Sequence, residues 1–116
     1  MAKRKKQRRA REKPVTVDYV DPEGNVLTLR QSLSPGTIRK IGEPPPRAAA
    51  SLEDAWARRE ELLFELLVVR WDIAGLPLTD QAMLLGRYRM ADAEMQRWVR
   101  ETIATHLQRH IPELAQ

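Results

Sequence analysis

The chain has 116 residues, a net charge of +4 and no cysteine. This length suits one small domain with a tail, and the absence of cysteine excludes a disulfide framework and a thiolate metal site. The sequence shows no secretory signal and no acyl-anchor motif, and its longest apolar stretch is interrupted by charges. We therefore expect a cytoplasmic protein without a membrane partner.

The positive charge is concentrated in residues 1–13. This arm holds eight Lys/Arg and one Glu, a charge of +7, whereas the other 103 residues hold twelve Lys/Arg and fifteen Asp/Glu, a charge of −3. Such an arm is predicted to be disordered when free. Its cations can bind nucleic-acid phosphates without reading the sequence; the alternative is an arm that only aids solubility. The candidate nucleic-acid-binding residues are Lys3, Arg4, Lys5, Lys6, Arg8, Arg9, Arg11 and Lys13.

Residues 15–30 are predicted to form a β-hairpin. Apolar and polar residues alternate on both sides of the turn segment 21–24, which is the periodicity of strands. The turn has Asp first, Pro second and Gly fourth, as suits a type I turn with a following left-handed residue. Because an isolated hairpin is marginal in water, it must pack on the helices or join another sheet.

A short helical turn and a linker complete the N-terminal part, residues 14–42. Ser34 is the predicted cap of the turn, Pro35 occupies its first position, and Gly42 ends it. Residues 43–50, with three consecutive prolines, are predicted to form a stiff linker.

Residues 51–76 are predicted to form a central buried helix. Ser51 is a good N-cap, Gly75 can take the left-handed position after the last turn, and Pro77 prevents continuation. The segment is apolar over most of its circumference. We therefore expect it to be covered by the C-terminal helices, the hairpin or a second chain.

Two further helices are predicted after Pro77. Thr79 is the expected cap of a helix over residues 80–90, whose apolar side consists of Met83, Leu84, Leu85 and Tyr88. Gly86 lies inside this helix at a cost of about 1 kcal/mol relative to alanine, and close helix packing is the expected reason. Asp92 is a candidate cap for a helix over 93–110. One face of that helix holds Met95, Trp98, Val99, Thr102, Ile103, His106 and Leu107.

Together these elements predict a mainly α fold. An N-terminal β-hairpin packs on a three-helix core formed by residues 51–116, with a disordered basic arm in front.

No constellation of catalytic residues is evident. His106 and His110 share a helix face, but a structural zinc site needs four ligands, and the glutamate of a metalloprotease motif does not follow the first histidine. We predict no enzyme activity, no metal and no cofactor. Trp56 lies toward the polar end of the central helix and is the best candidate for a protein contact, because Trp is enriched at interfaces.

The order of segments also suggests a family. A hairpin with VTVDYVDPEGNVLTL, then SLSPGTIRKI, then LLFELLVVRWDIAGLPLTDQ and LLGRYRMADAEMQRWVRETI resembles, in layout over residues 15–114, the small tail assembly chaperones of tailed bacteriophages and related prophages. The resemblance implies a cytoplasmic, non-enzymatic factor that binds tail-building proteins.

We therefore expect a small non-enzymatic assembly or adaptor protein that binds other proteins, or further copies of itself, through its helical body. The alternative is a nucleic-acid-binding accessory protein in which the basic arm makes non-sequence-specific phosphate contacts.

Overall fold

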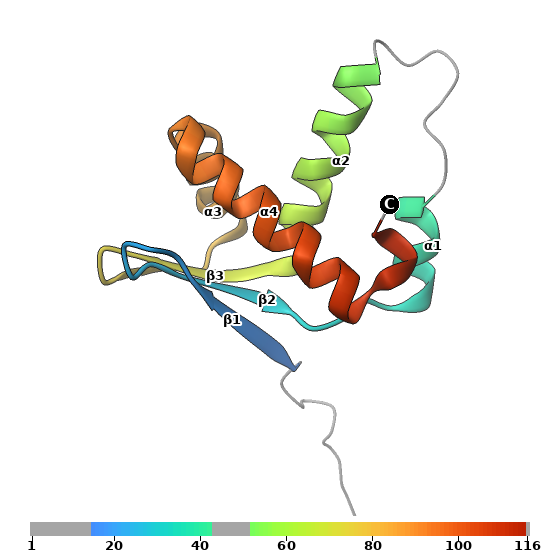
Figure 1. The fold of residues 1–116 in the computed structure, drawn as a ribbon, viewed down its shortest axis with the longest axis horizontal. Coiled ribbons are helices and arrows are strands. Elements are labelled where there is room, and N and C mark those ends of the chain that lie inside the picture. Colours follow the sequence, from blue (N-terminus) through green and yellow to red (C-terminus); the bar gives the residue numbers. More distant parts are fainter. Residues whose placement is uncertain (1–14, 43–51, 116) are drawn as a thin grey trace, which may run out of the picture.

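A four-stranded antiparallel sheet, in the order β1-β2-β3-β4, carries the helices α2 to α4 on one of its faces, and α1 lies beyond the end of the strands, beside the C-terminal residues (Figure 1). The computed structural model describes residues 15–42 and 52–115, apart from the side chains of residues 52–56. Over these ranges the fold is α+β, so the prediction of a mainly α, three-helix body is wrong. The predicted body contributes two strands that extend the N-terminal hairpin into one sheet.

The predicted hairpin is present. β1 (Thr16–Val20) pairs with β2 (Val26–Arg30) without a register shift. Asp21 organises the turn, because its Oδ1 accepts from the backbone N–H groups of Glu23 (2.8 Å) and Asn25 (2.9 Å). Gly24 has φ of +88°, the left-handed conformation that the turn requires.

The predicted helix 51–76 is wrong in its second half. α2 (Leu52–Leu67) ends where β3 (Val68–Ile73) begins, with no intervening loop. The sequence of β3, VVRWDI, is rich in β-branched and aromatic residues, which favour strands. It pairs with β2 on one side and β4 on the other, so its backbone groups are satisfied in the sheet.

Gly75 has the predicted left-handed conformation, but it lies in a hairpin turn and not at the end of a helix. Ala74 (φ +53°) and Gly75 (φ +80°) form the two-residue loop of a second hairpin, between β3 and β4 (Leu76–Leu78). Positive φ at both positions is typical of a type I′ turn. Pro77 lies in β4, an edge strand, where proline is tolerated.

The remaining helices lie close to their predicted positions. α1 (Pro35–Gly42) is capped by Ser34, whose Oγ accepts from Thr37 N at 3.2 Å. α3 (Gln81–Met90) is capped by Asp80 rather than by the predicted Thr79. α4 (Ala93–His110) begins after Asp92 as predicted, and a short 3-10 helix, η3 (Pro112–Leu114), follows it.

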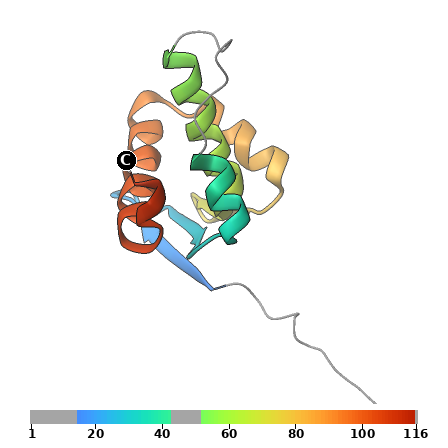
Figure 2. The ribbon, with the colours of Figure 1, turned by 90° about the vertical axis from the view of Figure 1, so that its right-hand side faces the viewer.

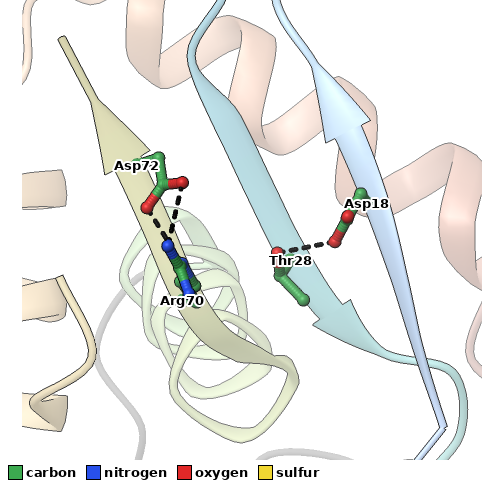
Figure 3. Close-up of polar contacts among 4 residues, drawn as sticks. All are labelled: Asp18, Thr28, Arg70 and Asp72. Atoms are coloured by element: carbon green, nitrogen blue, oxygen red, sulfur yellow. Dashed lines mark hydrogen bonds and ion pairs between the residues drawn. The ribbon is translucent and has the colours of Figure 1, made fainter. Parts of the chain in front are cut away.

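The core lies between the sheet and the helices. In Figure 2, α2 lies between α3 and α4. Trp71 and Leu27 from the sheet are fully buried together with Phe64 from α2 and Val99 from α4. The opposite face of the sheet carries polar side chains and has no covering element in the described ranges (Figure 3).

Candidate protein-interaction surfaces

The sequence-predicted binding residues lie outside what the structure describes. The eight basic residues of the arm precede residue 15. The backbone of Trp56 belongs to α2, but its side chain lies outside the described part of the chain. The contact proposed for Trp56 and the phosphate contacts proposed for the arm therefore stay predictions.

The two histidines of α4 connect that helix to the N-terminal hairpin. His106 is fully buried; its Nε2 lies 2.8 Å from the Arg30 carbonyl oxygen, and its Nδ1 lies 2.7 Å from the Tyr19 hydroxyl. Since a carbonyl only accepts, Nε2 carries the proton and Nδ1 accepts from Tyr19. Burial lowers the pKa of His106, which favours this neutral form.

Both ring nitrogens of His106 are therefore engaged within the chain, and this histidine has a structural role. His110 is half-buried beside it, with ring centroids 4.8 Å apart, and its Nδ1 is 3.4 Å from Gln31 Nε2. Among the residues that the structure describes, no group of three or more His, Cys, Asp or Glu could hold a metal ion.

A shallow cavity of about 230 Å³ lies between α2, α4 and the C-terminal residues. Its charged side chains are engaged within the chain: Arg59 Nη2 donates to the Leu114 carbonyl at 2.9 Å, and Arg100 Nε is 3.9 Å from Glu60. Its volume is below the ~300–1,000 Å³ typical of small-molecule sites. We therefore do not assign it a ligand.

The outer side of α3 is the most unusual surface of the molecule. Met83 and Met90 are 58% and 83% exposed, although α3 already buries Leu84 and Tyr88 on its inner side. Met83, Gly86 and Met90 are spaced three and four residues apart, which places them on one side of the helix. We call these three residues the α3 outer face. The apolar side predicted for residues 80–90 is thus buried only in part, because Met83 is exposed whereas Leu84 and Tyr88 are buried.

Gly86 gives this face its shape. A Cβ atom built on Gly86 would meet nothing within 4 Å, so the close helix packing expected at this glycine is not found among the described residues. The glycine nevertheless lowers helix stability by about 1 kcal/mol relative to alanine. The described part of the chain therefore provides no packing reason for this glycine, whereas a helix that docks against α3 would gain a closer approach there.

Two arginines flank the α3 outer face. Arg89 donates to both carboxylate oxygens of Glu61, at 2.9 and 2.8 Å, and this contact lowers the pKa of Glu61. The guanidinium carbon of Arg87 lies 5.9 Å from the centre of the Trp71 ring, within the range of a cation–π contact. No carboxylate in the described ranges forms an ion pair with Arg87. One flank of the face is thus neutralised, and the other carries a positive charge.

The open face of the sheet has a different character. Thr28 Oγ1 donates to Asp18 at 2.7 Å, and Arg70 donates to Asp72 at 2.9 and 3.2 Å (Figure 3). Charges of both signs lie side by side here, so this face does not extend the positive charge of the arm.

No family model, curated protein or solved structure matches the chain. Within the described residues, no helix is long and apolar enough to cross a membrane.

The α3 outer face was missed at the sequence level. Helical periodicity shows which side of a helix is buried when one side is apolar and the other is polar. α3 has apolar residues on both its buried and its exposed side, so its pattern does not show which side faces the core. The available signal was Gly86, a helix-interior glycine between two methionines at helical spacing.

Proposed function

We propose that this protein is a small non-enzymatic adaptor that binds another protein through the α3 outer face. The single observation that supports this proposal is the helix-interior Gly86, with open space above it, between the exposed Met83 and Met90. Methionine adapts to irregular apolar partners and is common at binding surfaces. An assembly factor, which is the role implied by the resemblance to tail assembly chaperones, would use such a surface.

The partner element that best suits this face is an amphipathic helix. Helix docking uses apolar anchors at spacings of three and four residues, which Met83, Gly86 and Met90 supply. Arg87, which has no ion-pair partner among the described residues, favours an acidic residue beside the partner's apolar stripe. Two copies of α3 crossing at Gly86 would bring their Arg87 side chains together, so a second copy is disfavoured.

The proposal predicts a loss of partner binding in the double variant Met83→Glu/Met90→Glu. The affinity of a partner recovered with the full chain is expected to fall at least about thirtyfold, the size of a central hot spot. Both side chains are exposed, so the free energy of unfolding should change little. The measurement is isothermal titration calorimetry with the purified partner.

Leu62→Glu is the matched control, because Leu62 is also an exposed apolar residue, at 40%, but lies on α2. Its partner affinity should equal that of the unmodified chain. The proposal would be contradicted if the double variant bound the partner as tightly as the unmodified chain, or if Leu62→Glu weakened binding as much as the double variant. Concentration-dependent self-association abolished by the double variant would identify a second copy as the occupant and also overturn it.

Gly86→Ala separates binding from stability. Because the added methyl group meets open space and the φ of Gly86 is not left-handed, the free energy of unfolding should rise by up to about 1 kcal/mol. Partner affinity should fall, since the methyl group would hold the docking helix away from α3. Chemical denaturation and calorimetry on one preparation give both values. A variant that is more stable and binds equally well would remove the reason given for this glycine.

The second candidate function is nucleic-acid contact by the basic arm, favoured by its charge of +7 against −3 for the other residues. If the eight cations bind phosphates, affinity for a duplex should fall by about 10³–10⁵ between 50 and 200 mM salt. A truncated chain that begins at Pro14 should lose this binding. Fluorescence anisotropy with a labelled duplex tests it; an unchanged affinity after truncation, or no binding by the full chain, would leave only the adaptor proposal.

A further inference from the structure

The two edges of the sheet differ in how far they are protected against pairing with another strand. β4 has three residues, one of them Pro77, and therefore offers little to an added strand. β1 has five residues, contains no proline and pairs with β2 without a bulge. In the described part of the chain no element lies beyond β1, which forms the margin of the sheet in Figure 1.

The free backbone groups of β1 can be identified from the hairpin ladder. Gln31 N donates to Val15 O at 2.9 Å, and Asp21 N donates to Asn25 O at 2.9 Å. Antiparallel pairing alternates, so the odd-numbered residues between these two bonds face β2. The N–H and C=O groups of Thr16, Asp18 and Val20 consequently point away from the sheet, where another strand could pair with them.

The side chains along β1 define what this strand should contain. Val17 and Tyr19 are partly buried on the helix side of the sheet, whereas Thr16, Asp18 and Val20 are exposed on the open side. Side chains directly opposite in an antiparallel pair lie on the same side of the sheet. An added strand would therefore place apolar residues on the helix side and polar residues on the open side.

Asp18 distinguishes among the candidate occupants. It is exposed at the middle of β1, with Thr28 Oγ1 at 2.7 Å. Antiparallel pairing of two β1 strands about their centres would place two Asp18 carboxylates opposite each other, which is destabilising. A strand with lysine or arginine opposite Asp18 would instead gain an attraction.

From these observations we infer that β1 binds an extended segment of a partner protein, with alternating apolar residues and a basic residue opposite Asp18. This is strand addition, a second binding mode independent of the α3 outer face. α4 packs over the β1–β2 hairpin through His106, which contacts Tyr19 and Arg30, whereas α3 packs on α2 and β3. Partners at the two sites can therefore bind at the same time.

A synthetic peptide of sequence VTVKVTV, with blocked ends, is the probe for this inference. In the expected register its lysine lies opposite Asp18, and its threonines lie opposite Thr16 and Val20. Its valine side chains then lie on the side of the sheet that the helices cover. Titration of the full chain by NMR should give saturable shifts, with slower hydrogen exchange at the amides of Thr16, Asp18 and Val20. No saturable binding, or shifts located elsewhere, would overturn the inference.

N-methylation of the peptide tests the hydrogen bonds without altering the protein. Residues opposite each other at a hydrogen-bonded position exchange both bonds, so methylation of the lysine and threonine nitrogens should weaken binding at least about tenfold. Methylation of the backbone nitrogens of the third, fifth and seventh residues, all valine, should leave the affinity nearly unchanged. In the expected register these N–H groups point away from β1. Equal effects of both patterns would rule out strand addition.

A charge exchange tests the contribution of Asp18. Replacing the peptide lysine by glutamate should weaken binding to the full chain about fivefold, the upper range for one cross-strand pair. The Asp18→Lys variant should reverse this preference. The basic arm is present in all four combinations, so its effect cancels in the double-mutant comparison. An unchanged preference in the variant would contradict the position assigned to the basic residue.

Discussion

Replacing Trp71 with alanine is expected to lower the free energy of unfolding by about 3–5 kcal/mol. Trp71 is fully buried in β3, which pairs with β2 on one side and β4 on the other. Its ring lies edge-on to Phe64, at a centroid distance of 6.0 Å. Alanine would therefore leave a cavity where the sheet meets α2. Urea denaturation followed by circular dichroism measures the change.

Two substitutions serve as controls. Trp98→Ala removes a ring of the same size that is only partly buried, and its cost should be clearly smaller. Trp71→Phe removes the Nε1 hydrogen, for which no described residue is an acceptor. Relief of an unsatisfied buried donor, worth about 1–3 kcal/mol, should offset much of the lost contact area. A cost for Trp71→Phe as large as that for alanine would show that the indole nitrogen has a partner.

The parts of the fold that were predicted correctly depend on local signals. The hairpin has alternating strands around a turn with Asp and Gly at suitable positions, and the Asp21 carboxylate accepts hydrogen bonds within that turn. α4 has a clear N-cap in Asp92 and a single apolar face, which is the face that the structure buries. Each element could be identified without knowledge of its neighbours in space.

The error at α2 and β3 has a physical cause. A continuous apolar run does not distinguish a buried helix from a buried strand by periodicity alone. Gly75 added to the ambiguity, because a left-handed glycine ends helices and also forms type I′ hairpin turns. Whether residues 68–73 form a helix or a strand depends on β2, because one side of β2 would have no pairing strand without β3. That partner lies about forty residues away in the sequence, beyond the reach of local patterns.

The binding surfaces could be predicted only in part. The charge of the basic arm is evident from composition, but no pattern shows that Met83 and Met90 remain exposed after Leu84 and Tyr88 have filled the inner side of α3. The edge position of β1 likewise depends on the order of strands in the complete sheet. The α3 outer face and the β1 edge therefore became identifiable only once the complete fold was known.

Acidification below about pH 6.5 is expected to destabilise the fold through His106. Burial lowers the pKa of His106 below its usual 6.5, with a further lowering from the neighbouring His110. The unfolded chain therefore binds the proton more readily than the folded chain, and stability rises with pH. The contribution is complete above about 6.5 and is lost as pH falls toward the lower folded-state pKa. Chemical denaturation at pH 7.5 and 5.5 measures the difference.

His106→Gln is the informative variant, because glutamine can still donate to the Arg30 carbonyl but does not titrate. Its free energy of unfolding should change less between pH 7.5 and 5.5 than that of the unmodified chain, whereas His110→Gln should keep most of the change. Glu61 does not contribute to the difference between pH 7.5 and 5.5. Arg89 lowers the pKa of Glu61 below the usual 4.5, so the stability that this carboxylate provides is lost only at more acidic pH.

His106→Ala should cost about 2–4 kcal/mol at pH 7.5, because it leaves a cavity and removes the partner of the Arg30 carbonyl and the Tyr19 hydroxyl. Tyr19→Phe removes only one of these hydrogen bonds, and we expect it to cost about 1 kcal/mol. An acid response that persists unchanged in His106→Gln would assign the pH dependence to other groups. The link between α4 and the hairpin would then be independent of the charge state of this histidine.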